Sequence, residues 1–211
     1  MKQTDTLQSH SWNPAGFLTL ETTHTQTRIW FMGDGVARIR TSFSGHFSEE
    51  SLSLVWTAWE DHYDSLLCSE RHRTFPLAPE IDDRDPNCLF IRCDGLVLTV
   101  QREPFAISCG HIGSGFSFRD VPGRAYTYRQ GHITHSFCLD DSYFYGFGEK
   151  TGHLEKTGVS MRMSNKDACG YDPIRTDPLY KHITWVNEHY EDERPKVDVV
   201  AYVTEDEEFA A

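Results

Sequence analysis

The sequence predicts an all-β protein that folds as a large antiparallel β-sandwich. Two segments have the alternating pattern of β-hairpins, and further short apolar runs follow, mostly separated by Gly, Asp or Pro. The chain has 211 residues, of which 38% are hydrophobic and 13% aromatic, so it can bury a sizeable core. Sandwiches of this length commonly form a single domain.

The first hairpin is expected over residues 28–43. An apolar run leads to the turn Gly33-Asp34-Gly35, after which apolar and polar residues alternate. Successive side chains of a strand point to opposite faces. One face is therefore expected to hold Ala37, Ile39, Thr41 and Phe43, and the other Arg38, Arg40 and Ser42.

The second hairpin is expected over residues 89–101. Asp94-Gly95 separates Leu-Phe-Ile-Arg-Cys from Leu-Val-Leu-Thr-Val. Asp-Gly between two apolar runs is the usual signature of a two-residue type I′ turn, because both residues tolerate a positive φ. The turn fixes the register of the two strands.

Further strands are predicted over 105–109, 116–118, 133–139 and 197–203, and a loop over 79–87. Many short strands are typical of sandwiches and barrels. The exception is 49–72, where large apolar residues recur at helical spacing and predict a helix. They are Leu52, Val55, Trp56, Trp59, Tyr63, Leu66 and Leu67.

The charge of the chain argues against two classes of partner. It has 32 acidic and 20 basic side chains, and the net charge of −12 repels nucleic-acid phosphates and anionic lipid headgroups. No apolar stretch is long enough for a membrane span, and residues 1–15 lack the basic and apolar parts of a signal peptide. We therefore expect a cytoplasmic protein with no nucleic-acid or membrane partner.

The cysteines lack any spacing typical of a metal site. The six cysteines include no C-x-x-C pair, so we expect buried or half-buried free thiols. They are Cys68, Cys88, Cys93, Cys109, Cys138 and Cys169. Three disulfides are the alternative if the protein is secreted.

No catalytic or metal motif stands out among the other polar residues. His132 and His135 are three apart in a predicted strand and so face opposite sides, which argues against a shared metal. The acidic pairs Glu60-Asp61, Asp82-Asp83 and Asp140-Asp141 are expected in solvated turns. Gly146-Phe147-Gly148 lacks the Lys-Ser/Thr pair of a phosphate loop. We expect no metal, no cofactor and no catalytic residue in this chain.

A set of short motifs lies between residues 143 and 183. Residues 144–152 read Phe-Tyr-Gly-Phe-Gly-Glu-Lys-Thr-Gly, residues 165–167 Asn-Lys-Asp, residues 170–173 Gly-Tyr-Asp-Pro, and residues 176–181 Thr-Asp-Pro-Leu-Tyr-Lys. In order and spacing this run resembles the end of the N-terminal domain of glycoside hydrolase family 31 enzymes of the α-glucosidase type. A weaker similarity extends to 97–105 and 122–126.

The resemblance implies a galactose mutarotase-like β-sandwich that packs on a (β/α)₈ barrel. In the family, two barrel aspartates hydrolyse α-glycosidic bonds with retention. The nucleophile motif Trp-x-Asp-Met-Asn-Glu has no counterpart here. The resemblance therefore implies a domain cut off before its catalytic barrel and inactive alone, whose parent acts on α-glucosides or malto-oligosaccharides.

The resemblance also assigns a substrate-binding role to two residues. The family's Asn-x-Asp loop projects into the barrel mouth, and the match places Asp167 at the sugar hydroxyls, with Asn165 bracing the loop. A carboxylate can accept two hydrogen bonds from neighbouring hydroxyls. The residues alone equally allow an Asx turn in an exposed loop.

The similarity ends after residue 183, so we expect the sandwich domain over 1–183 and a divergent junction or tail over 184–211. A truncated gene and a free-standing descendant both remain open.

As an alternative function, a free-standing carbohydrate-binding module would use Trp12, Trp30, Trp56, Trp59 or Trp185 to stack on sugars. A mutarotase-like isomerase has no supporting His/Glu pair. A sandwich without its barrel should expose an apolar patch and self-associate.

Overall fold

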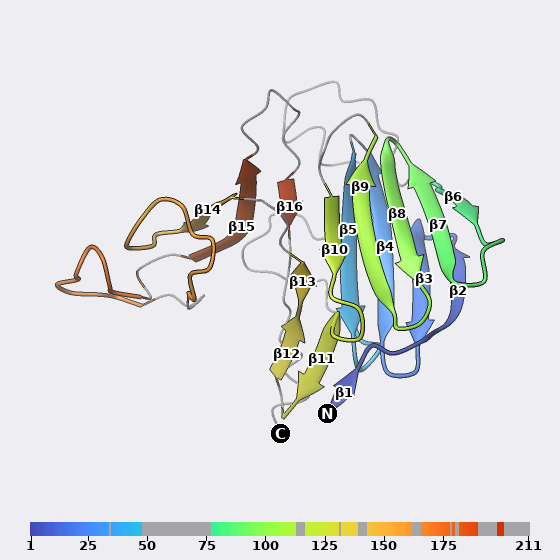
Figure 1. The fold of residues 1–211 in the computed structure, drawn as a ribbon, viewed down its shortest axis with the longest axis horizontal. Helices are drawn as coiled ribbons and strands as arrows, with labels where there is room; N and C mark the ends of the chain where they lie inside the picture. The colour runs from blue at the N-terminus through green and yellow to red at the C-terminus, as the bar shows by residue number, and fades with distance from the viewer. Residues whose placement is uncertain are drawn as a thin grey trace.

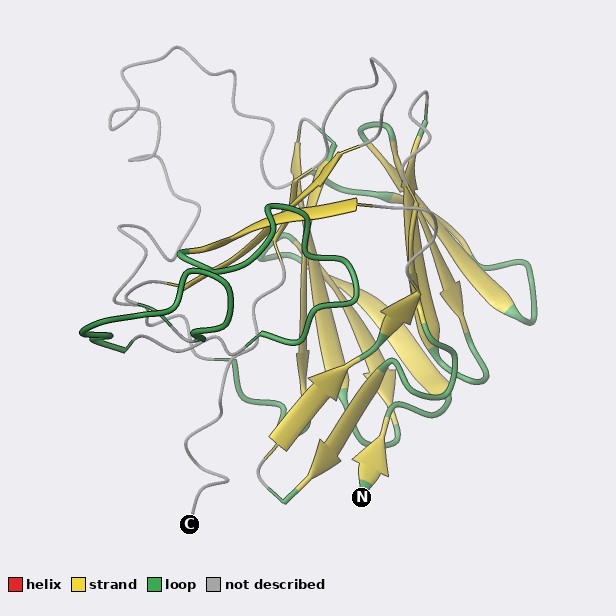
Figure 2. Ribbon diagram, turned by 60° about the vertical axis from the view of Figure 1, so that its left-hand side comes forward, coloured by secondary structure: helices red, strands yellow, loops and turns green. Residues whose placement is uncertain are grey.

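The structure is a computed structural model of the 211-residue chain. It describes residues 1–33, 35–47, 77–112, 117–130, 132–138, 143–161, 166–177, 179, 182–189 and 198–200. Within these ranges the chain forms strands and loops and no helix, as Figure 2 shows. The predicted all-β antiparallel fold is confirmed.

Two large sheets form the sandwich (Figure 1). The first is a four-stranded antiparallel meander of β2 (Leu7–Asn13), β3 (Phe17–Thr22), β4 (Gln26–Gly33) and β5 (Val36–Ser42). The second has the order β13-β10-β9-β8-β7-β6. Its strands are β6 (Glu80–Asp82), β7 (Cys88–Cys93), β8 (Leu96–Gln101), β9 (Ala106–His111), β10 (Ser117–Asp120) and β13 (Phe137–Cys138).

The core lies between these two sheets. Alternate residues of β3 and β4 meet alternate residues of β7, β8 and β9, as strand pleating requires. Leu18, Leu20, Ile29 and Phe31 come from the first sheet, and Leu89, Ile91, Leu98, Val100 and Ile107 from the second. Most are fully removed from solvent, so apolar burial is the main stabilising term.

Two smaller sheets complete the described part of the fold. β1 (Lys2–Gln3), β11 (Tyr126–Arg129) and β12 (His132–His135) form one three-stranded sheet. The other consists of β14 (Tyr143–Gly148), β15 (His182–His189) and β16 (Asp198–Val200). In Figure 1, β14 and the chain that follows it lie to one side of the sandwich.

Both predicted hairpins are present. Asp94 and Gly95 have φ values of 46° and 81°, and Cys93 pairs with Leu96 across a two-residue turn, as a type I′ turn requires. In β5, Ala37 and Ile39 pack against the core as expected. The opposite face is not simply solvated, because Arg40 and Ser42 are also buried.

Other expectations need correction or fall outside the described ranges. The loop predicted over 79–87 contains a short edge strand, β6, because Ile81 pairs with Ile91 and packs against the core. Strand β15 spans residue 183 and β16 lies beyond it, and the domain boundary expected there stays a prediction. The helix predicted over 49–72 lies outside the described residues.

Candidate functional site

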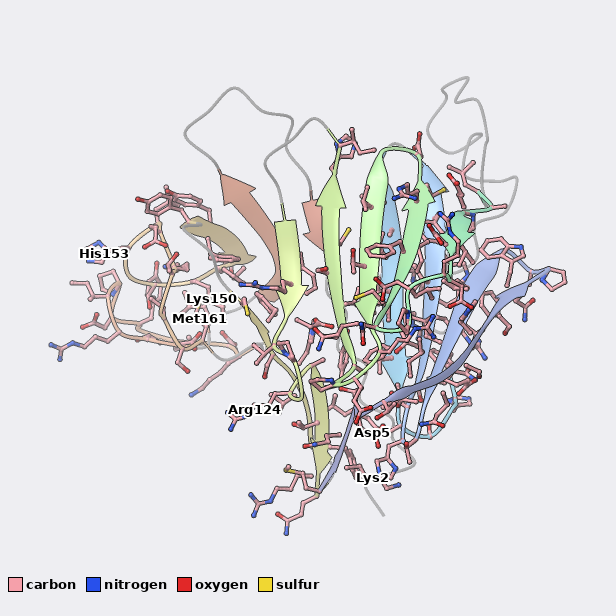
Figure 3. All side chains as sticks on the ribbon, turned by 45° about the vertical axis from the view of Figure 1, so that its right-hand side comes forward. Lys2, Asp5, Arg124, Lys150, His153 and Met161 are labelled. Carbon is pink, nitrogen blue, oxygen red and sulfur yellow. The ribbon has the colours of Figure 1, made fainter. Side chains whose placement is uncertain are left out.

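The segment that carries the motif residues follows β14, and we call it the motif loop: residues 149–161, 166–177 and 179 as described. It projects beyond the sandwich in Figure 1, and Figure 3 labels Lys150, His153 and Met161 on it. Among its described residues only Lys156, Ala168 and Leu179 are buried. The loop is therefore not held by a hydrophobic core of its own.

The end of β14 turns the chain into this loop. Gly146, Phe147 and Gly148 have φ values of 104°, 68° and 80°, and the pairing with β15 shifts register between Gly146 and Gly148. Positive φ values suit glycine and are unusual for phenylalanine. The two glycines that resemble a phosphate loop in sequence thus flank a break in the strand register.

A first set of contacts joins the two ends of the loop. Lys150 Nζ lies 2.9 Å from Asp177 Oδ1, and the Lys150 side chain is only 3% exposed. Thr151 Oγ1 donates to the Thr176 carbonyl at 2.7 Å, and the Gly152 amide donates to the Pro173 carbonyl at 2.9 Å. These three contacts hold residues 150–152 against 173–177.

A second set closes the first half of the loop on itself. The Lys156 ammonium is buried and donates to the carbonyls of Thr151, at 2.8 Å, and His153. The Lys156 amide donates to the Phe144 carbonyl at 2.8 Å, which ties the loop to β14. Hydrogen bonds from Thr157 lower the pKa of the Glu155 carboxyl.

Asp172 organises the second half. Its Oδ1 accepts the amides of Ile174 and Arg175 at 2.8 and 3.0 Å, and its own amide donates to Thr176 Oγ1 at 2.9 Å. A carboxylate that accepts nearby amides in this way forms an Asx turn. The Gly-Tyr-Asp-Pro motif therefore has a structural role here.

The predicted sugar-binding residue Asp167 lies on this loop and is exposed. The preceding amide, that of Lys166, donates to the Leu179 carbonyl at 2.9 Å, and the following residue, Ala168, is buried. The backbone is thus held on both sides of an exposed carboxylate. Asn165 lies outside the described residues, so the pairing of the two residues stays a prediction.

The acidic pair Asp82-Asp83 lies at an exposed edge of the sandwich and is paired with cations. The Arg84 guanidinium lowers the pKa of Asp82 to about 2. Hydrogen bonds from His10 and Arg102 lower the pKa of Asp83. Both carboxyls are therefore held ionised and are unsuited to donate a proton near neutral pH.

Histidine and cysteine side chains give no metal site within the described ranges, where no three His, Cys, Asp or Glu side chains gather around one point. His135 instead contacts Asp120. Four thiols are half-buried and free, those of Cys88, Cys93, Cys109 and Cys138, as expected. Cys169 is exposed, contrary to expectation, and Cys68 lies outside the described residues.

Sequence reasoning missed two polar pairs that organise the molecule, Lys150–Asp177 and Asp120–His135. Their members are 27 and 15 residues apart. The strand pattern alone does not specify such pairs. The only available signal was that Lys150 and Asp177 both lie within the recognised motifs.

Together, the fold and the loop define an antiparallel β-sandwich that carries an anchored polar loop. A family model described as the glycosyl hydrolase 31 N-terminal galactose mutarotase-like domain matches residues 26–194, which is more than half of the chain. The chain belongs to this domain family. The match continues past residue 183 and through the end of β15.

Individual relatives agree with the family. Alpha-glucosidase 2 of Bacillus thermoamyloliquefaciens is 47% identical over 86 residues, which make up 40% of this chain and 11% of that protein. A Flavobacterium johnsoniae GH31 dextranase, solved with isomaltotriose, has a TM-score of 0.72 at 20% identity, over 89% of this chain and 22% of the dextranase.

The cycloalternan-forming enzyme of Listeria monocytogenes, solved with a pentasaccharide substrate, has a TM-score of 0.63 at 13% identity. That match covers 87% of this chain and 16% of the enzyme. The chain thus spans about a fifth or less of the length of these relatives. Within the described ranges, no helix is long and apolar enough to cross a membrane.

Proposed function

We propose that this chain is the sandwich domain of an enzyme that acts on α-glucosides, and that its motif loop forms one wall of the sugar pocket. The single observation that supports this role most is the exposed carboxylate of Asp167 on a backbone anchored through Lys166 and Ala168. An exposed side chain on a held backbone can contact a ligand at little entropic cost.

Asp167 would bind the substrate through sugar hydroxyls. Its two oxygens can accept from adjacent hydroxyls, and charge-assisted hydrogen bonds are stronger than neutral ones. Asn165 would brace the same loop. The substrate class rests on the relatives, since the dextranase was solved with isomaltotriose and the cycloalternan-forming enzyme with a pentasaccharide.

Hydrolysis itself would require residues that lie outside this sequence. The chain spans 11% of alpha-glucosidase 2 and 22% of the dextranase, so most of each relative has no counterpart here. We propose a (β/α)₈ barrel as the partner that carries the two catalytic carboxylates. The purified 211-residue chain should then not hydrolyse p-nitrophenyl α-glucoside, and turnover by it would refute this assignment.

The same proposal makes a claim about Asp167 in a longer parent enzyme. Asp167→Ala should raise KM there, because the lost contact is made to bound substrate. Glu80→Ala is the matched control, since Glu80 is an exposed carboxylate on β6, far from the motif loop in sequence. Unchanged kinetic constants in Asp167→Ala would refute the assignment.

The alternative of a free-standing carbohydrate-binding module is less well supported by the described tryptophans. Trp30 is 9% exposed and packs against Phe17 at 5.2 Å between ring centroids. Trp12 packs against the core cluster. A module that binds sugar on an open aromatic platform would give a strong calorimetric signal with maltose, whereas one wall of a sugar pocket should bind sugar only weakly.

A cytoplasmic location is also proposed. The four half-buried thiols of the described residues are free, which suits a reducing compartment. Fusion of the chain to a redox-sensing reporter would test it. An oxidised chain with paired cysteines in cells would argue against that location.

A further inference from the structure

We propose that Lys150 and Asp177 form a clamp that fixes the backbone bearing Asp167. They are positioning residues, and their effect on sugar binding rests on the proposed function of Asp167. The clamp itself is a claim about this chain and can be tested without sugar.

The ion pair lies where the motif loop begins and ends. Lys150 is two residues after β14, and Asp177 is two residues before the buried Leu179. The Nζ–Oδ1 distance is 2.9 Å, with side-chain exposures of 3% for Lys150 and 27% for Asp177. Because the Lys150 side chain is shielded from water, this pair interacts more strongly than one between two fully exposed side chains. Removing one partner takes this ion pair away from the other side chain.

Two flanking hydrogen bonds extend the clamp. Thr151 Oγ1 reaches the Thr176 carbonyl and the Gly152 amide reaches the Pro173 carbonyl, so residues 150–152 run beside 173–177. Gly152 has a φ of 83°, and a Cβ there would lie 3.4 Å from the Ile174 carbonyl oxygen. The Cβ contact would be ordinary van der Waals contact, so it is the positive φ that favours glycine at this position.

The path from the clamp to Asp167 is short. From Asp177 the chain reaches Leu179, whose carbonyl accepts the Lys166 amide at 2.9 Å. Lys166 directly precedes Asp167. Few described residues of the motif loop are buried, so among the contacts of the described residues it is these polar ones that restrain this backbone. Loss of the ion pair should release Leu179 and, with it, the segment around Asp167.

The test uses amide hydrogen exchange of the whole ¹⁵N-labelled chain. Lys150→Met keeps side-chain length without charge, and Asp177→Asn keeps shape without charge. Each should lower the protection of the Lys166 amide by about tenfold, which is the size expected from a partly buried pair. Amides of β7 and β8 in the sandwich core should not change. The exchanged pair Lys150→Asp/Asp177→Lys should restore part of the protection.

A titration with isomaltose tests the sugar-binding role of Asp167 separately from the existence of the clamp. The two variants should weaken sugar binding while thermal unfolding of the sandwich stays unchanged, and the exchanged pair should recover part of the affinity. Asp167→Ala should abolish binding and leave Lys166 protection intact. Unchanged Lys166 protection in both single variants would overturn the clamp. If the unaltered chain binds no sugar, the proposed function is overturned. The hydrogen-exchange protection of the Lys166 amide in the variants would still test whether the clamp exists.

Discussion

His135 Nε2 lies 2.7 Å from Asp120 Oδ1, and Asp120 is 1% exposed. The other carboxylate oxygen, Oδ2, accepts the Ile107 amide at 2.9 Å. The pair therefore joins β12 of a small sheet to β10 and β9 of the six-stranded sheet. The Tyr126 ring stacks on His135 with centroids 4.2 Å apart and planes 5° from parallel.

Asp120→Ala should destabilise the fold strongly. It leaves the buried Ile107 amide and the His135 ring without their acceptor, and such a loss costs about 2 to 4 kcal/mol. Urea unfolding measures the change in free energy, with Glu80→Ala as the exposed-carboxylate control. A loss for Asp120→Ala no larger than that of the control would show that the pair is not structural.

Stability should fall in alkaline solution because of Tyr126. Burial, followed by the charge of Asp120, raises the pKa of the Tyr126 phenol above its ordinary value of 10.0. The folded state thus binds this proton more tightly than the unfolded state, so the stabilisation is complete below about pH 10 and is lost as the pH rises from there through the folded-state pKa. The free energy of unfolding of Tyr126→Phe should decline less steeply than that of the unaltered chain as the pH rises above about 10. Identical slopes of unfolding free energy against pH in Tyr126→Phe and the unaltered chain would contradict a raised pKa of Tyr126.

Two cysteines should differ sharply in reactivity. Burial raises the pKa of Cys109 to about 11, whereas Cys169 is exposed. Because the thiolate is the reactive species, iodoacetamide at about pH 8 should modify Cys169 much faster than Cys109. Peptide mass spectrometry over a time course distinguishes the two sites. Equal rates in the native chain would rule out the described burial of Cys109.

The motif loop and the start of β14 expose large apolar side chains. Five of these side chains are 49 to 78% exposed, namely Tyr143, Leu154, Val159, Tyr171 and Ile174. The double variant Leu154→Ser/Ile174→Ser should reduce self-association in sedimentation velocity, since it removes apolar surface that favours contact between copies. Val36→Ser, on the sandwich, is the control. If the unaltered chain, the double variant and Val36→Ser associate equally, the contact between copies does not involve Leu154 and Ile174.

Local signals explain which elements were predictable from sequence. The Asp94-Gly95 hairpin is specified by two turn residues and by strict alternation, so its register followed directly. The strand β2 was missed because Leu7 is its only buried residue, which leaves no alternating pattern. In β15 the sequence around Asn187 is polar, and its strand conformation depends on pairing with β14 and β16, which lie far away in sequence.

The candidate site was predictable only in part. The motif match indicated Asp167, and the structure holds the backbone around it. The partners Lys150 and Asp177 could not be paired from sequence, because Lys and Asp are common on surfaces and the loop between them has no periodicity. The burial of the Lys150 side chain beside Asp177 became visible only in the structure, where the two ends of the loop lie together.

The most direct measurement is an NMR titration of the ¹⁵N-labelled chain with isomaltose. If Asp167 contacts sugar hydroxyls, chemical-shift changes should concentrate in the amides around residues 166–179. They should disappear in Asp167→Ala and persist in Glu80→Ala. Shift changes that are unaffected by Asp167→Ala, or that map to the sandwich sheets, would contradict the proposal that the motif loop is the wall of a sugar pocket.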